Sequence, residues 1–474
     1  MKNNYLLLVL FLFQISLFSQ KAVITFKNED VSRKTNKDAV ILSNSLTHDL
    51  TILLVERKDV HAYLFNSDFE LQSQFQTELI KSKYDEPLGF KLSNNKQHIL
   101  FSNSKRKQFG VLTLNFETKN STATELDFNF EDELFIEALP YKNKLYVLSS
   151  TKDQDILIRE MTDNLDFKLV NTMKINQEDI SLNERKNHST FSLFGTSNSN
   201  IQKIDPRVPN SIEQTSHANK LYQYDNLTYL TFEMEEYGTL VYTLNLDDLS
   251  YQVKTYEYPK GKLDDLKRFN SYISPNYFYQ IASSKDEMRF LINDLSGVLI
   301  TDYFVKRDAS ISFKNTPIIQ EGATAVPFVN RRELEESSKY LRKITSGDLG
   351  ITVLKQDNHF YITLGGYKEV NNSGGGIMIS GGVSTVGPTH VMVMNPTFYS
   401  YNAYTSSKST YFTSKLNSEF KHVKGKISEN VFEKIKKFSS KFKYITAENV
   451  FFHNNQLYFG YFDLKKATYS LNAF

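Results

Sequence analysis

The chain contains neither cysteine nor tryptophan. Without cysteine it can form no disulfide framework, no thiolate metal site and no cysteine nucleophile, and it offers no acceptor for a lipid just after an N-terminal leader. Sugar-binding clefts often use tryptophan as a stacking platform, so its absence counts mildly against a carbohydrate enzyme, although the 28 tyrosines could substitute. At 474 residues the chain is long enough to bury a core without disulfides.

The chain also lacks an excess of charge of either sign. It has 56 Lys and Arg against 54 Asp and Glu, and neither sign gathers in one long block. A nucleic-acid-binding protein normally shows a basic stripe. We therefore expect no nucleic acid among its partners.

Long apolar runs are missing except at the N-terminus. Lys2 precedes an apolar segment from Leu6 to Phe13, and Ser19 offers a small residue for cleavage, a pattern typical of a secretory signal peptide. The apolar segment is shorter than the roughly 20 residues of a membrane span. The sequence predicts a signal peptide over 1–19, a single domain over 20–474, and a periplasmic or secreted protein that neither spans the membrane nor carries a lipid anchor; peripheral membrane association stays open.

Repetition is the strongest pattern in the sequence. Residues 48–75 show three alternating apolar runs separated by polar turns, which predict consecutive antiparallel strands. Each repeat is preceded by a shorter apolar segment, giving four strands per unit. The same pattern returns over 96–128, 143–173, 227–258 and 277–305.

Two further units complete the series. Residues 349–370 predict the first two strands of a sixth unit, and 409–427 its third and fourth. Residues 447–474 predict three strands of a seventh unit, whose fourth strand would be 22–28 from the N-terminus. Such closure would leave no exposed sheet edge at the seam.

This organisation resembles that of the β-propeller superfamily, in which four-stranded units repeat as blades. No WD dipeptide or kelch signature is present, so the resemblance carries over no functional residue. It implies an all-β, seven-bladed β-propeller with a central channel, closed by the N-terminal strand. Two or three β-sandwich domains are the alternative.

Four long insertions interrupt the repeats, at 176–216, 306–348, 371–408 and 428–446. In a blade of alternating antiparallel strands, the connection from the second to the third strand and the connection to the next blade leave on the same side. All four insertions use these connections. Helical and hairpin insertions are therefore expected on one face.

Two helices are predicted within these insertions. One begins with Asn330 and Glu333 as a capping box and ends at Gly347; the other begins with Asn430 and Glu433. The second helix carries a basic side that includes Lys434 and Lys437. We interpret this side either as solvated surface or as a docking ridge for an acidic partner or lipid headgroups.

The glycine-rich stretch 371–397 fits no nucleotide or nucleophile motif. It lacks the lysine of a P-loop, and Gly382, Ser384 and Gly387 are spaced too widely for a nucleophile elbow. We interpret it as a β-rich flap that either folds over its own blade or contacts a partner through methionine and aromatic side chains. The predicted contact residues are Ile377, Met378, Ile379, Met392, Met394, Phe398, Tyr399, Tyr401 and Tyr404, together with Lys434 and Lys437.

No metal or cofactor site is predicted. The histidines show neither HxH nor HExxH spacing, and the Asp-rich turns lack the glycine and distal glutamate of a calcium loop. The stretch 204–214 offers Asp205, Arg207 and Glu213 for ligand contact, but we interpret it as a segment that covers the channel mouth. Candidate channel carboxylates are Glu86 and Glu137.

These patterns favour a non-catalytic, protein-binding scaffold or accessory subunit of a cell-envelope complex, with export or assembly of outer-membrane proteins as one setting by analogy of fold. The alternative is a propeller that binds a glycan or small ligand, or a hydrolase or lyase that uses the channel mouth. Convergent carboxylates with raised pKa would favour that alternative.

Overall fold

The structure is a computed structural model, and it describes residues 22–28, 37–81, 83–84, 86–93, 96–130, 132–152, 155–174, 201–234, 238–263, 265–321, 331–368, 395–406 and 409–474. Two compact units make up the chain. The terminal unit comprises Met1–Glu78 and Lys434–Phe474, and the central unit comprises Leu79–Glu433. Each is described by itself.

The terminal unit contains two four-stranded antiparallel sheets. The first, in spatial order, consists of β2 (Asp38–Ser43), β3 (Leu50–Glu56), β4 (Asp59–Phe65) and β5 (Leu71–Glu78). The second consists of β28 (Ile445–His453), β29 (Gln456–Asp463), β30 (Thr468–Ala473) and β1 (Ala22–Lys27).

The central unit contains five sheets, three with four strands and two with five. The four-stranded sheets are β6 (Glu86–Ser93), β7 (Lys96–Ser102), β8 (Phe109–Asn115) and β9 (Asn120–Glu125); β10 (Leu134–Tyr141), β11 (Lys144–Ser150), β12 (Ile156–Met161) and β13 (Phe167–Met173); and β19 (Arg268–Ile273), β20 (Tyr277–Ser283), β21 (Glu287–Asp294) and β22 (Leu299–Lys306).

The five-stranded sheets each gain a strand from an insertion. In the first, β14 (Gln202–Ile204) pairs in parallel with β15 (Asn219–Tyr224), followed by β16 (Leu227–Met234), β17 (Gly238–Asn245) and β18 (Tyr251–Glu257). The second runs β25 (Asp348–Gln356), β26 (His359–Tyr367), β27 (Ser409–Leu416), β23 (Ile318–Glu321) and β24 (Arg331–Leu334).

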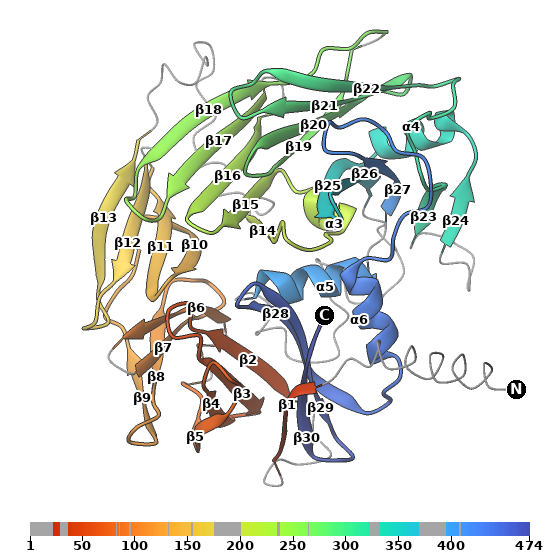
Figure 1. The fold of residues 1–474 in the computed structure, drawn as a ribbon. Helices are drawn as coiled ribbons and strands as arrows, with labels where there is room; N and C mark the ends of the chain where they lie inside the picture. The colour runs from red at the N-terminus through yellow and green to blue at the C-terminus, as the bar shows by residue number, and fades with distance from the viewer. Residues whose placement is uncertain are drawn as a thin grey trace, which may run out of the picture. The chain divides into compact units, whose positions relative to one another are not determined.

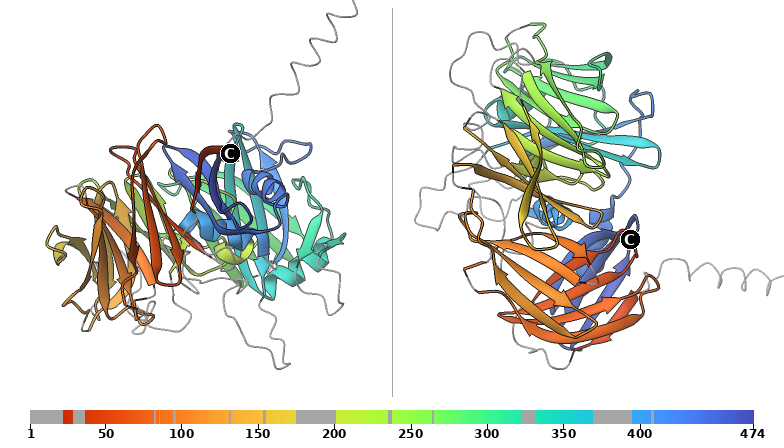
Figure 2. Two further views of the ribbon diagram at one scale, coloured as in Figure 1. Left: turned by 90° about the horizontal axis from the view of Figure 1, so that it is seen from below. Right: turned by 90° about the vertical axis from the view of Figure 1, so that its left-hand side faces the viewer.

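Burial along the strands follows their place in a sheet. Every residue of β3 except the last is buried, whereas β5, the outermost strand of the same sheet, alternates between exposed and half-buried positions. First strands of neighbouring sheets contact each other: β2 with β28 in the terminal unit, and β6 with β10 and β19 with β25 in the central unit. Figures 1 and 2 show the twisted sheets of each unit. The prediction of a seven-bladed β-propeller is confirmed.

The N-terminal strand closes the last blade, as predicted. β1 pairs antiparallel with β30, with Ile24 opposite Leu471. Ile24 is 4% exposed and belongs to the same core cluster as Leu471 and Tyr469. A strand from one end of the chain therefore completes a sheet built from the other end.

The prediction for the fourth strand of the sixth blade was wrong. Residues 417–427 form no strand. The Asn417 amide donates to the Lys421 carbonyl at 2.9 Å and turns the chain back after β27, and the segment adds only an isolated bridge of His422 with Leu416. β23 from the preceding insertion takes that place beside β27. Its Ile318 and Ile319 are buried, an apolar content that the Lys-rich segment 421–426 cannot supply.

The two predicted helices differ in outcome. The capping box of α6 (Val431–Ser439) is confirmed, since the Glu433 amide donates to Asn430 Oδ1 at 3.1 Å and the Asn430 amide to Glu433 Oε2 at 2.9 Å. The capping of α4 (Ser337–Thr345) by Asn330 and Glu333 was wrong. Glu333 lies in β24, because its pairing with Ile319 of β23 prevails over the local helix signal.

Two more helices occur where the sequence predicted none. α3 (Ile212–Thr215) lies in the insertion at 176–216, and Ser211 caps it by accepting the Gln214 amide at 3.1 Å. α5 (Pro396–Ser406) contains the aromatic run that follows the glycine-rich stretch. Proline suits the first turn of a helix because it has no N–H to leave unpaired.

Closure by β1 predicts a difference between adjacent residues of that strand. Ile24→Ala should lower the free energy of unfolding by about 2–4 kcal/mol, because it leaves a cavity in the core. Val23, 39% exposed, is the matched control, and Val23→Ala should cost under about 1 kcal/mol. Urea unfolding of the purified chain measures both. Equal losses would show that β1 contributes no buried contact.

Candidate functional site

The predicted contact residues fall into three groups. Ile377, Met378, Ile379, Met392 and Met394 lie outside the described residues. Lys434 and Lys437 are exposed on α6. The four aromatic residues Phe398, Tyr399, Tyr401 and Tyr404 lie on α5.

Two of the four aromatic residues on α5 are buried. Phe398 and Tyr401 are 9% and 6% exposed, so in the described structure they face other parts of the protein rather than a partner. Tyr401 and Tyr404 pack against Phe432, with ring centroids 5.3 and 5.8 Å away. Asn430 Nδ2 donates to the Tyr404 hydroxyl oxygen at 2.7 Å, and burial raises the pKa of Tyr404 to about 12.

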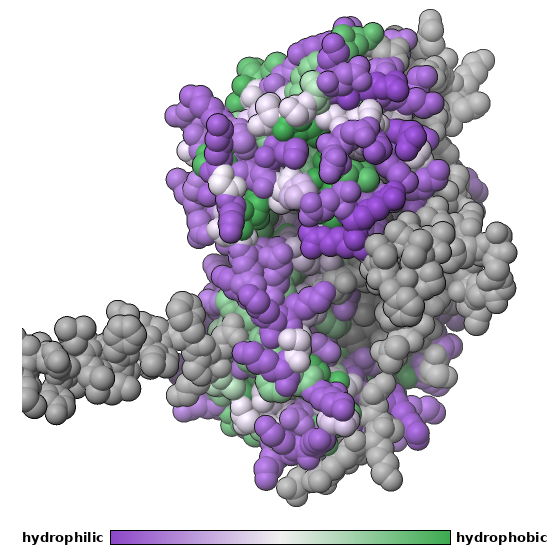
Figure 3. Space-filling view, turned by 90° about the vertical axis from the view of Figure 1, so that its right-hand side faces the viewer, coloured by the Kyte–Doolittle hydropathy of each residue, from purple (hydrophilic) through white to green (hydrophobic). Residues whose placement is uncertain are grey.

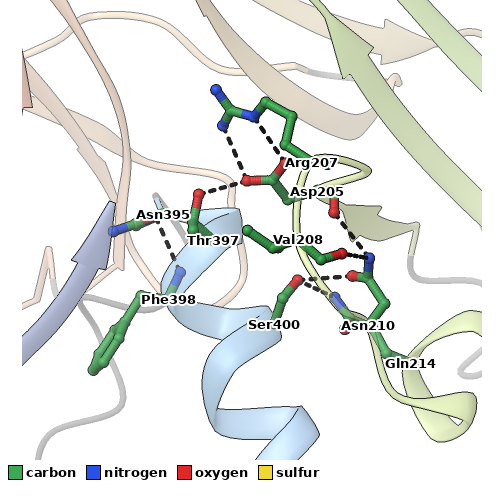
Figure 4. Close-up of polar contacts among 9 residues, drawn as sticks. All are labelled: Asp205, Arg207, Val208, Asn210, Gln214, Asn395, Thr397, Phe398 and Ser400. Atoms are coloured by element: carbon green, nitrogen blue, oxygen red, sulfur yellow. Dashed lines mark hydrogen bonds and ion pairs between the residues drawn. The ribbon is translucent and has the colours of Figure 1, made fainter. Parts of the chain in front are cut away.

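A buried carboxylate holds the N-terminal end of α5 (Figure 4). Asp205 is 2% exposed and accepts hydrogen bonds from Arg207 Nε at 2.9 Å and Nη2 at 3.0 Å. Thr397, the second residue of α5, donates its hydroxyl to the same carboxylate. Burial alone would raise the pKa of Asp205, but the Arg207 charge and the hydrogen bonds outweigh it and hold that pKa below its usual value.

A second set of hydrogen bonds continues the network one turn along α5. The Ser400 hydroxyl donates to Asn210 Oδ1 at 2.8 Å, and Gln214 Nε2 donates to the Ser400 oxygen at 3.1 Å. Asn210 Nδ2 in turn donates to the carbonyls of Asp205 and Val208 at 2.8 and 2.9 Å (Figure 4). The network thus joins α5 to the loop and helix α3, which lie far away in the sequence.

Helix α3 itself lies against the innermost strand of the sixth blade. α3 contacts β25 and β26. A Cβ on Gly350 of β25 would lie 2.7 Å from the Ile212 carbonyl oxygen, so the backbones approach as only glycine allows. Helix α3 is therefore packed closely against the first strand of this blade, and the interpretation of 204–214 as a cover of the channel mouth stays a prediction.

The two candidate channel carboxylates are each neutralised by a cation. Glu86 accepts from Arg106 Nη2 at 2.6 Å and from its Nε at 3.2 Å. Glu137 accepts from Lys203 Nζ at 3.1 Å and from the Ala138 amide at 2.9 Å. Burial lowers the pKa of Arg106, but Glu86 and Glu137 outweigh burial and raise it.

A buried lysine in the central unit is satisfied in the same way. Lys220 Nζ donates to the His217 carbonyl at 2.8 Å and to Asn270 Oδ1 at 2.9 Å, and lies 3.4 Å from Glu233 Oε1. Burial lowers the pKa of Lys220, and Glu233 partly opposes this effect. These contacts fix the lysine in the packing between strands β15, β16 and β19.

Two carboxyl groups of the terminal unit behave differently. Asp38 in β2 and Glu448 in β28 are half-buried, and no hydrogen bond or ion pair to a described residue compensates them. Burial raises the pKa of Asp38 to about 7 and also raises that of Glu448. The strands are neighbours, since the Ala447 amide donates to the Lys37 carbonyl at 2.9 Å. Each pKa is raised by desolvation, and neither by the charge of the other group.

The described residues lack two other kinds of feature. No three His, Asp or Glu side chains in this part of the chain are grouped so that they could hold a metal ion. No helix within it is long and apolar enough to cross a membrane.

Comparisons with known proteins give only distant likenesses. No family model matches the chain, and no curated protein matches it. One solved structure that it resembles is an ACO/RPE65 chimera, with 8% sequence identity and a TM-score of 0.29 over 59% of this chain and 63% of that chain. A second is a prolyl endopeptidase, with 9% identity and a TM-score of 0.32 over 91% of this chain and 46% of that chain. Another is prolyl oligopeptidase B from Galerina marginata, with 10% identity and a TM-score of 0.28 over 69% of this chain and 38% of that chain. The chain spans less than two thirds of each of these proteins.

The Asp205 network predicts that a single hydroxyl on α5 matters for stability. Thr397→Val should lower the free energy of unfolding by about 1–3 kcal/mol, because a buried carboxylate loses a donor. Thr122, exposed on β9, is the control, and Thr122→Val should change stability by under about 0.5 kcal/mol. Urea denaturation measures both, and an unchanged midpoint for Thr397→Val would contradict the role of the network.

Asp38 predicts a pH effect on stability. With a folded-state pKa of about 7 against 3.8, the folded chain holds this proton more tightly, so its contribution is complete below pH 3.8 and is lost as pH rises to about 7. Asp38→Asn should therefore stabilise the chain at pH 8 by about 1–3 kcal/mol and not at pH 4. Asp68 lies on an exposed turn, so Asp68→Asn should leave the free energy of unfolding unchanged at both pH values.

Urea midpoints at the two pH values test the Asp38 prediction. A gain of the same size at both would mean that the effect of Asp38→Asn does not come from ionisation of the carboxyl group.

Proposed function

We propose that this chain is a non-catalytic, protein-binding scaffold that serves as an accessory subunit of a cell-envelope complex. The observation that carries the proposal is the Asp205 network, which fixes the insertion helices α3 and α5 to each other within the central unit. A surface fixed in advance binds a partner without the cost of ordering its own helices on contact.

The state of the inner carboxylates supports binding over catalysis in the central unit. Glu86 and Glu137 are paired with Arg106 and Lys203. Both carboxylates already contact a cation of the chain, so in this arrangement their charges are used within the fold. The proposal therefore gives these four residues a structural role.

The proposed partner contact is mainly polar. Among the coloured residues in Figure 3, hydrophilic ones predominate, and hydrophobic ones occur in small separate groups. Transient and accessory interfaces are commonly of this kind, with no more apolar area than the rest of the surface. The predicted leader at 1–19 supports a location in the periplasm or outside the cell, where outer-membrane protein export or assembly is one setting for such a subunit.

A second candidate function is binding or turnover of a small ligand in the terminal unit. Asp38 favours it, because a carboxyl group with a pKa near 7 can accept and donate a proton at neutral pH. In this candidate, a hydrolase or lyase would use Asp38, and Glu448 on the neighbouring strand would be the further carboxyl group to test.

An affinity purification from gently solubilised envelopes tests the scaffold proposal. One variant replaces residues 377–394, which include the predicted methionine contacts, with a Gly/Ser linker of equal length. The control replaces 180–197, in another insertion, in the same way. We expect a stoichiometric protein partner with the wild type and the control, and its loss from the 377–394 variant, with urea midpoints unchanged.

Two outcomes would contradict this expectation. Recovery of the wild-type chain alone would favour the small-ligand candidate. Full retention of a partner by the 377–394 variant would remove that segment from the contact surface while leaving the scaffold role in place.

A further inference from the structure

Seven exposed lysines gather on the terminal unit. We call them the lysine surface: Lys434, Lys436, Lys437, Lys441, Lys443, Lys465 and Lys466. The first three lie on α6, the next two follow it, and the last two lie in the turn between β29 and β30. The Leu464 amide donates to the Tyr444 carbonyl at 3.0 Å, which brings the turn against the segment that follows α6.

Carboxylates of the described residues offset only part of the charge of the lysine surface. Asp463 is the carboxylate nearest the turn, but its Oδ1 accepts the amides of Lys465 and Lys466 at 2.9 and 3.2 Å, and its side chain is only 17% exposed. Within the described residues, Lys441, Lys443 and Lys465 have no ion pair with a carboxylate. Their charge is therefore available to an anionic partner.

Aromatic rings hold these three lysines in place. Lys465 Nζ lies 4.2 Å and Lys443 Nζ 5.6 Å from the centroid of the Tyr444 ring, and Lys441 Nζ lies 5.8 Å from that of Phe438. Tyr444 is itself 43% exposed. Cations held over rings lose less freedom on binding, and exposed tyrosine is a residue type enriched in protein interfaces.

The apolar side of α6 is already in use. The Phe438 ring lies 5.5 Å from that of Phe474 and 6.2 Å from that of Phe459, and the Phe442 ring lies 4.8 Å from that of Tyr461. A helix that binds a bilayer needs a free apolar side to enter the lipid. This packing favours a protein over a membrane as the occupant.

Helix electrostatics explains only part of the lysine surface. Lys436 and Lys437 lie in the last turn of α6, where positive charge offsets the partial negative charge of the helix terminus. Lys443 and Lys465 lie outside the helix and gain no such stabilisation. Their place beside an exposed tyrosine calls for a different explanation.

We propose that the lysine surface, centred on Tyr444, binds an acidic segment of a partner protein. This inference rests on the proposed scaffold function and names the chemistry of its partner. Carboxylates of that segment would lie over Lys441, Lys443 and Lys465, and the Tyr444 ring would supply the apolar contact.

Fluorescence anisotropy with a labelled peptide of alternating glutamate and alanine tests the proposal on the purified full-length chain. The variant carries Lys441→Gln, Lys443→Gln and Lys465→Gln, which keep the length of the side chains and remove their charge. The control carries Lys58→Gln, Lys107→Gln and Lys306→Gln, at exposed lysines with no ion pair to a described residue. We expect about tenfold weaker binding for the variant, unchanged binding for the control, and loss of wild-type binding at about 1 M salt.

Each other outcome overturns the proposal. These outcomes are no peptide binding by the wild type, equal loss in variant and control, binding to phosphatidylglycerol vesicles without binding to the peptide, and self-association that the variant abolishes. A failure here leaves the scaffold proposal testable by the affinity purification. Failure of that purification alongside peptide binding would leave the surface without a physiological partner.

Discussion

A buried carboxylate holds together the part of the central unit that strand periodicity does not explain. Asp205 could not remain ionised at 2% exposure without compensation, and it receives this from Arg207 in its own loop and from Thr397 of α5. Asn210, Gln214 and Ser400 extend the arrangement with hydrogen bonds between neutral groups. If Arg207 or Thr397 moved away, the Asp205 carboxylate would stay buried without full compensation, which costs free energy. We therefore expect α5 and the loop at 204–216 to keep one relative arrangement.

This constraint links the fold to the proposed function. The blades supply a regular framework, and the insertions supply what differs between one propeller and another. Here helix α3 packs against β25, and α5 is joined to α3. The carboxylates of Glu86 and Glu137 on the first strands of two blades form ion pairs with Arg106 and Lys203. The exposed surface includes lysines that no carboxylate of the described residues neutralises. Binding through such a surface depends on charge and salt more than on apolar area.

The regular part of the fold could be predicted from the sequence, and the irregular part could not. The alternation of apolar residues predicted the strands of the blades. The unpaired strand predicted at 22–28 supplied the fourth strand that the last blade lacked. The fourth strand of the sixth blade could not be predicted in this way. It is β23, which precedes the first strand of that blade, β25, in the sequence. Helix α5 carries Phe398, Tyr399, Tyr401 and Tyr404 without a clear apolar stripe, so its pattern favoured no element.

Only half of the Asp205 network could be predicted from the sequence. Asp205 and Arg207 lie in a proline-stiffened loop, and the sequence indicated them as groups available for ligand contact in a segment interpreted as a cover. Thr397 and Ser400 lie about 190 residues away along the chain, and nothing in a single sequence pairs them with Asp205 and Asn210. The three-residue spacing of Thr397 and Ser400, just after Pro396, is the one signal of a polar helix face that could have been noticed.

Site-specific photo-crosslinking in intact cells tests the central claim most directly. A photoreactive phenylalanine analogue at position 444 would lie on the lysine surface, and the same analogue at position 107 serves as the control. Our account predicts one discrete crosslinked product with another protein from position 444 and none from position 107. Crosslinks to no protein from position 444, or the same products from both positions, would contradict the lysine surface as the place where this chain binds a partner protein.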